Sequence, residues 1–116
     1  MIIDDVEYVR ADQQQKPAIN TDGLPYVVVR SRDSGAHAGF LVREDGNTLT
    51  LTESRRLWYW DGAATLSQIA IDGVSKPNKC KFPEPRREIT IYGCCEKIAA
   101  TEKAQKSIQG VSPWKQ

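Results

Sequence analysis

The chain has 116 residues, enough for one hydrophobic core and too few for two. Apolar residues make up 40% of it and charged residues 27%, which is ordinary for a globular protein, and no apolar run approaches the roughly 20 residues that a membrane helix needs. The 16 basic and 15 acidic residues leave a net charge of +1, so the molecule as a whole has no strong attraction for duplex nucleic acid and any anion site must be local.

The first residues lack the basic region and long apolar stretch of a secretory signal, which predicts a protein of the cytoplasm. We expect residues 1–25 to form an N-terminal arm, because they hold scattered apolar positions, a run of glutamines and turn-forming residues. Residues 26–116 are then the folded, ligand-binding domain.

Several strands are predicted along this domain by β-branched and aromatic residues, by alternation of polar and apolar positions, and by turn signals between them. They cover residues 26–31, 37–43, 48–52, 55–60 and 88–98, the last with a break at Gly93. Thr65 and Thr101 are expected to cap two short helices that end at Gly73 and Gly110. Three prolines predict a loop over residues 74–87. The fold class is therefore α+β, one small antiparallel sheet of about five strands with two short helices.

No catalytic motif with useful specificity is present: there is no phosphate-binding loop, no nucleophile elbow and no dinucleotide fingerprint. The only histidine, His37, has no carboxylate fixed near it by the sequence, which favours a structural or ligand-contacting role over catalysis. Cys80, Cys94 and Cys95 lack the paired spacing of a zinc site, so we expect free thiols, no metal and no cofactor. A binding protein is more consistent with these residues than an enzyme.

Arginines stand beside aromatic residues in the segment RRLWYW at 55–60, and a lysine precedes a phenylalanine at 81–82. Guanidinium groups match phosphate oxygens and aromatic faces stack on bases, so this pairing suits a nucleotide. The alternative is that Trp58 and Trp60 are core residues, which is the commoner use of tryptophan.

The order of motifs resembles a family of small phage proteins. The segments that carry the likeness are GAHAGF at 35–40, RRLWYW at 55–60, GAA at 62–64, LSQ at 66–68, CKFP at 80–83 and TEKA at 101–104. The family is similar to the first-described Thoeris anti-defence sponge, a non-enzymatic homo-oligomer that captures cyclic ADP-ribose isomers and whose relatives hold cyclic oligonucleotides. The likeness covers about residues 26–116.

The resemblance implies a phage anti-defence protein of the host cytoplasm, a dimer or assembly of dimers, that binds a nucleotide-derived immune signal without degrading it. It implies phosphate or ribose contacts from Arg30, His37 and Arg56, base stacking by Phe82 or Trp58, and charge balance from Lys81. The alternative is a phage inhibitor that binds a host defence protein directly through the same aromatic and basic surface.

Overall fold

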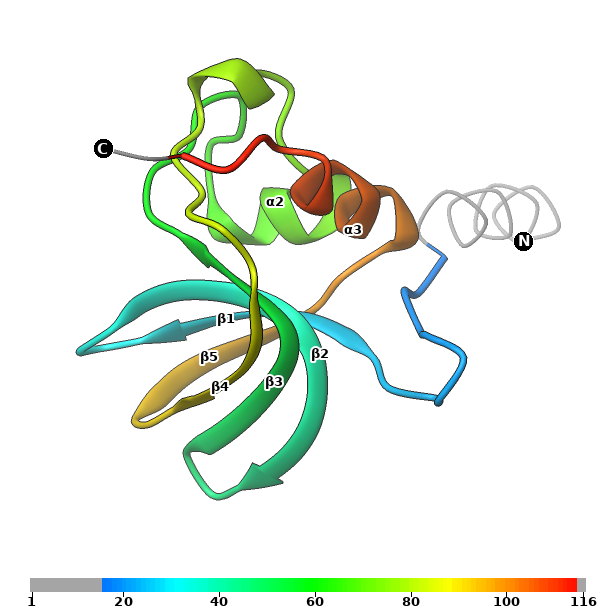
Figure 1. Ribbon diagram of the computed structural model, residues 1–116, viewed down its shortest axis with the longest axis vertical. Helices are drawn as coiled ribbons and strands as arrows, with labels where there is room; N and C mark the ends of the chain where they lie inside the picture. Colours follow the sequence, from blue (N-terminus) through cyan, green and yellow to red (C-terminus); the bar gives the residue numbers. More distant parts are fainter. Residues whose placement is uncertain (1–15, 115–116) are drawn as a thin grey trace, which may run out of the picture.

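The computed structural model describes residues 16–114, which form a five-stranded antiparallel sheet with two α-helices over one face (Figure 1). The strands are β1 (Tyr26–Ser31), β2 (Gly35–Asp45), β3 (Thr48–Leu57), β4 (Arg86–Ile91) and β5 (Cys94–Ala99), and the helices are α2 (Leu66–Asp72) and α3 (Glu102–Gln109). A 3-10 turn, η1 (Pro77–Lys79), lies within the proline-containing loop. The predicted fold class, α+β with five strands and two helices, is confirmed.

Two strand boundaries differ from the prediction. The segments 48–52 and 55–60 belong to a continuous strand that ends at Leu57, because a β-bulge interrupts the pairing without ending the strand. The register passes from Ala38 opposite Arg55 to Phe40 opposite Thr52, so two residues of β3 face Gly39 alone. The segment 88–98 forms two strands, since β4 pairs with β3 and β5 with β1, and the chain turns from one edge of the sheet to the other at Gly93, which adopts a φ of 66°.

The sheet is strongly curved. Its order is β4-β3-β2-β1-β5, so β4 and β5 lie at opposite edges although only residues 92 and 93 connect them. Flat, these edges would stand about 19 Å apart, whereas the three peptide units from Ile91 to Cys94 reach at most about 11 Å. The sheet therefore curls (Figure 1). The Ser31 hydroxyl at the end of β1 donates to the Tyr92 carbonyl at 2.8 Å.

Each face of the curved sheet has its own apolar cluster. The face under the helices contributes Tyr26, Val28, Ala38, Phe40 and Leu57, which pack with Leu66 and Ile69 of α2 and with Ala104 and Ile108 of α3. The inner face of the curl holds Val27, Val29, Leu49, Leu51 and Ile91. Both clusters follow from strand alternation, which sends neighbouring residues to opposite faces.

A buried arginine joins the sheet to the helices. Arg55 is 2% exposed, and its guanidinium donates to four backbone carbonyls: Phe82 at 3.2 Å, Pro83 at 3.1 Å, Ile108 at 2.8 Å and Gln109 at 3.5 Å. Two of these carbonyls belong to the last turn of α3, where the helix dipole favours a cation. One side chain of β3 thus holds the proline-containing loop and α3 in place.

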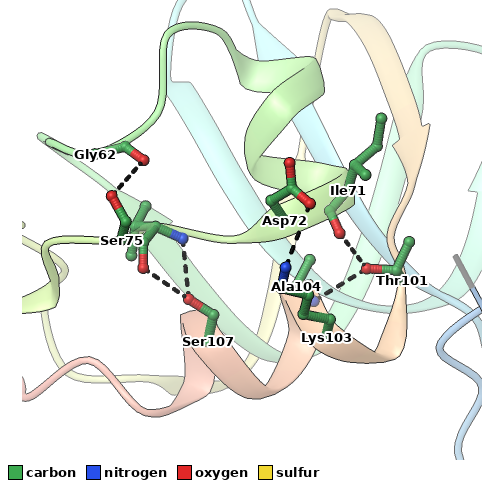
Figure 2. Close-up of polar contacts among 9 residues, drawn as sticks. Gly62, Ile71, Asp72, Ser75, Thr101, Lys103, Ala104 and Ser107 are labelled. Atoms are coloured by element: carbon green, nitrogen blue, oxygen red, sulfur yellow. Dashed lines mark hydrogen bonds and ion pairs between the residues drawn. The ribbon is translucent and has the colours of Figure 1, made fainter. Parts of the chain in front are cut away.

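The helices begin where the capping threonines predict. The Thr65 hydroxyl accepts from the Gln68 amide and that of Thr101 accepts from the Ala104 amide, both at 3.1 Å. Figure 2 shows that Thr101 also donates to the Ile71 carbonyl of α2, at 2.6 Å. One hydroxyl therefore caps α3 and joins it to α2.

The N-terminal boundary of the folded domain lies before the predicted residue 26. Ala18 is buried against the helix-side cluster, and its amide donates to the Ala100 carbonyl at 3.0 Å. Residues 17 and 19 form single β-bridges with Thr101 and Pro25. The rest of the predicted arm, residues 1–15, lies outside the described residues.

Replacing Thr101 with alanine should destabilise the protein more than replacing Thr65 with alanine. Each change removes a helix cap that contributes about 1 kcal/mol, but only Thr101→Ala also removes the partly buried bond to the Ile71 carbonyl of α2, which adds about 1 kcal/mol. Urea unfolding of the two variants measures the difference. Equal losses of stability would contradict the second role of Thr101.

Replacing Arg55 with lysine should cost about 2–4 kcal/mol of unfolding free energy, because one ammonium group cannot reach four carbonyls that a planar guanidinium reaches. Arg56→Lys, at the next position and half-buried, is the matched control and should cost less than about 1 kcal/mol. Chemical denaturation of both variants provides the comparison. Similar costs would show that Arg55 does not have the structural role assigned here.

Candidate functional site

A cavity of about 420 Å³ opens at the end of the sheet where β1 turns into β2 and β3 ends. Its size is within the range of small-molecule sites. The lining residues come from three segments: Arg30, Ser31, Asp33 and Ser34 from β1 and the turn, Gly35 and Ala36 from β2, and Arg56, Leu57, Trp58 and Trp60 from the end of β3 and beyond. We call this space the arginine–tryptophan cavity.

Two guanidinium groups reach the cavity from different strands. Arg30 is exposed on β1, and Arg56 is half-buried on β3. Arg56 donates one bond, from Nη1 to the Ser34 carbonyl at 2.7 Å, which fixes its side chain and leaves its other N–H groups for a ligand. Asp33 is the single acidic residue of the lining, so the wall carries a net positive charge.

Two indole rings supply the apolar part of the wall. Trp58 is 63% exposed, which is unusual for so large an apolar side chain, whereas Trp60 packs partly against the helix-side cluster. Trp58 therefore offers a free ring face, and Trp60 both supports the wall and lines it. The sequence left open whether the two tryptophans are core or site residues. Trp58 is an exposed residue of the cavity wall, whereas Trp60 belongs to both the wall and the edge of the core.

The turn at the cavity is held rigidly by polar contacts. The Ser31 hydroxyl accepts from the amides of Asp33 at 3.3 Å and Ser34 at 3.4 Å. The Ser34 carbonyl accepts from His37 Nε2 at 3.1 Å as well as from Arg56. Because the amides are engaged within the turn, an anion in the cavity would be met by arginine side chains instead.

His37 lies beneath the turn and does not line the cavity. It is fully buried, and since a carbonyl only accepts, its Nε2 carries the proton while Nδ1 has no partner among the described residues. Burial, together with the charge of nearby Arg56, lowers the pKa of His37 to about 4. The structure thus places His37, predicted from the sequence as a ligand contact, outside the cavity lining, where it is neutral and positions Ser34.

Two further predicted site residues lie elsewhere. Phe82 is fully buried, and the Arg55 guanidinium stands 5.6 Å from its ring centre, so it has no free face for base stacking and belongs to the core. Lys81 is exposed with its ammonium 5.8 Å from the ring of Tyr59 and 5.5 Å from that of Trp114, outside the cavity lining. Of the six predicted residues, Arg30, Arg56 and Trp58 come together.

Sequence reasoning did not select Trp60 and Ser34 for the site. Trp60 shares the alternation of Arg56 and Trp58, so the period of two could have placed it in the same wall. Nothing in the sequence marks Ser34, because its contribution is a backbone carbonyl whose position depends on the turn.

Neither a metal centre nor a membrane span is found in the part of the chain that is described. Among residues 16–114, no three His, Cys, Asp or Glu side chains are close enough to hold a metal ion, and no helix has the length and apolar character to cross a bilayer. Cys80, Cys94 and Cys95 are free thiols.

Residues 24–108 match the family described as "Domain of unknown function (DUF6948)", and the chain belongs to that family. The match spans β1 to most of α3 and so includes every residue of the arginine–tryptophan cavity. Searches of curated proteins and of solved structures returned no match to this chain.

The low pKa of His37 predicts a pH dependence of stability. Between about pH 6.5, where the unfolded histidine titrates, and the folded pKa of about 4, the unfolded state binds the proton and the folded state does not, so stability falls as the pH falls. Lowering the pH from 7.5 to 4.5 should cost about 2–3 kcal/mol through this residue.

The His37→Gln variant is the control, because it can still donate to Ser34 and lacks the titration. Urea unfolding at both pH values should show a smaller decrease for the variant than for the wild type. Carboxylates titrate in both proteins and cancel in this comparison, so identical decreases would contradict the assignment.

Proposed function

We propose that this protein binds a nucleotide-derived signal in the arginine–tryptophan cavity and holds it without chemical change. The observation that supports this proposal is the convergence on one cavity of Arg30 from β1 and of Arg56, Trp58 and Trp60 from the end of β3 and beyond. Guanidinium groups bind phosphate oxygens through paired N–H groups, and an indole face stacks on a base. Together they recognise the two chemically different halves of a nucleotide.

The same groups favour holding over reacting. Arginine stays protonated at neutral pH and indole does not titrate, so neither acts as a general acid or base there. His37 is buried, neutral and bonded to the Ser34 carbonyl. The Ser31 hydroxyl donates to the Tyr92 carbonyl, and the Ser34 hydroxyl lies 3.3 Å from the engaged Nε2 of His37, so within residues 16–114 neither hydroxyl is hydrogen-bonded to a carboxylate that could activate it.

The ligand class comes from the family resemblance in the motifs 35–40 and 55–60, which supply much of the cavity wall. We propose cyclic ADP-ribose isomers as the signal, with cyclic oligonucleotides as a second class, and a role for the protein as a phage anti-defence sponge in the host cytoplasm that works as a homo-oligomer. In a bound cyclic ADP-ribose isomer, the pyrophosphate would face Arg30 and Arg56, and the adenine would face Trp58.

Calorimetric titration with cyclic ADP-ribose isomers and cyclic trinucleotides should detect binding of one of them. Heating the complex should then release the ligand intact by mass spectrometry. An altered product would show an enzyme instead. Absence of any heat together with co-purification of a host protein would support the alternative, a direct inhibitor whose interface includes the exposed rings of Trp58 and Tyr59.

Four variants test whether the ligand binds to the residues that line the arginine–tryptophan cavity. Arg30→Ala and Trp58→Ala each remove a lining group and should weaken binding about tenfold or more. Lys81→Ala and Tyr59→Ala remove an exposed cation and an exposed ring outside the lining, and should leave the affinity within about twofold. Equal effects of the two pairs would place the ligand elsewhere.

A further inference from the structure

The structure has a second cavity, of about 320 Å³, between the bulge of β3, the start of β4 and the end of α3. Its lining consists of Tyr26, Glu53, Arg55, Pro85, Arg86, Arg87 and Gln109, and it shares no residue with the arginine–tryptophan cavity. We propose that this bulge cavity is a separate binding site for a small hydroxylated phosphate ester, such as a sugar phosphate.

The first observation is an unused hydroxyl. Tyr26 is fully buried, and its hydroxyl has no hydrogen-bond partner among the described residues. Burying a hydroxyl without a partner costs free energy, and phenylalanine would fill the same space without that cost. Burial also raises the pKa of Tyr26, so the hydroxyl stays protonated and can donate to a ligand oxygen.

The second observation is the charge of the lining. Arg86 and Arg87 are exposed at the mouth, and Arg55 lies buried in the wall with its guanidinium engaged by backbone carbonyls. Three arginines against one glutamate leave the cavity positive. Arg86 and Arg87 both line this cavity, and guanidinium groups favour an oxyanion with several acceptor oxygens, such as a phosphate.

The third observation concerns Glu53, the acidic residue of the lining. It adopts a φ of 52° within the β-bulge, a conformation that glycine or asparagine takes more readily. Strain of this kind gathers at functional sites, and here the bulge directs a carboxylate to a cavity of opposite charge. A carboxylate accepts from hydroxyl groups and repels phosphate oxygens, so Glu53 favours a ligand with hydroxyls over a bare anion.

These groups define the ligand by its parts. The phosphate would face Arg86 and Arg87, and the hydroxyls would face Glu53, Tyr26 and the Gln109 amide. Inorganic phosphate supplies only the first part and a free sugar only the second. The expected order of affinity is therefore sugar phosphate above inorganic phosphate and above free sugar.

The test is calorimetric titration of the full chain with ribose 5-phosphate, inorganic phosphate and ribose. We expect saturable binding of ribose 5-phosphate, and affinities at least about tenfold weaker for the other two. Tyr26→Phe removes only the hydroxyl and should weaken binding about tenfold while raising the melting temperature. Glu53→Asn suits the positive φ and should also weaken binding without loss of stability.

The Arg56→Ala variant locates the site, because it changes only the other cavity. Binding of ribose 5-phosphate that persists in Arg56→Ala and weakens in Tyr26→Phe supports the proposal. No binding by the wild type would overturn it, as would binding that is lost in Arg56→Ala and unchanged in Tyr26→Phe. Because the ligand and variants differ from those of the cyclic-nucleotide experiment, failure of either proposal is recognised separately.

Discussion

The arrangement of the molecule depends on the buried guanidinium of Arg55. The sheet, the proline-containing loop and α3 come from distant parts of the sequence, and the four carbonyls bound by Arg55 are where they meet. A charge buried so deeply is stable only when its donors are engaged, so the loop and the helix end must be in place together. Phe82, packed under this guanidinium, belongs to the same junction.

The curvature of the sheet also has a local cause. The bulge at Glu53 and Ser54 places two residues opposite Gly39, where a Cβ would stand 3.1 Å from the Ser54 Cα and 3.1 Å from the Leu51 Cβ. Only glycine permits this close approach without a shift of the backbone. The bulge adds twist and bend, and the short connection at residues 92 and 93 keeps the two edges near each other. The antiparallel register pairs Ala36 with both Arg30 and Leu57, so the turn of β1 and β2 lies beside the end of β3, where the arginine–tryptophan cavity forms.

Local signals in the sequence predicted local structure well. Thr65 and Thr101 marked the starts of both helices, because a cap depends on residues within one turn. Alternation correctly placed Arg55 and Arg56 on opposite faces of β3, but it could not predict which face of the strand would be buried. The buried face depends on the proline-containing loop and on α3, which lie about 30 and about 50 residues further along the chain, respectively. The bulge was missed for a similar reason, since it depends on the residue across the sheet.

The candidate site was predicted in part because residue type does not determine exposure. Trp58 and Phe82 carry the same stacking potential, yet one is 63% exposed and the other fully buried under Arg55. Arg30 and Lys81 carry the same charge, yet only Arg30 lines the cavity that Arg56 also lines. His37 is the clearest example. It lies under the turn beside residues that line the cavity, but it is itself buried and binds the Ser34 carbonyl instead of a ligand. The exposed groups of this cavity are guanidinium groups, which attract negative charge, and indole rings, which stack on flat rings.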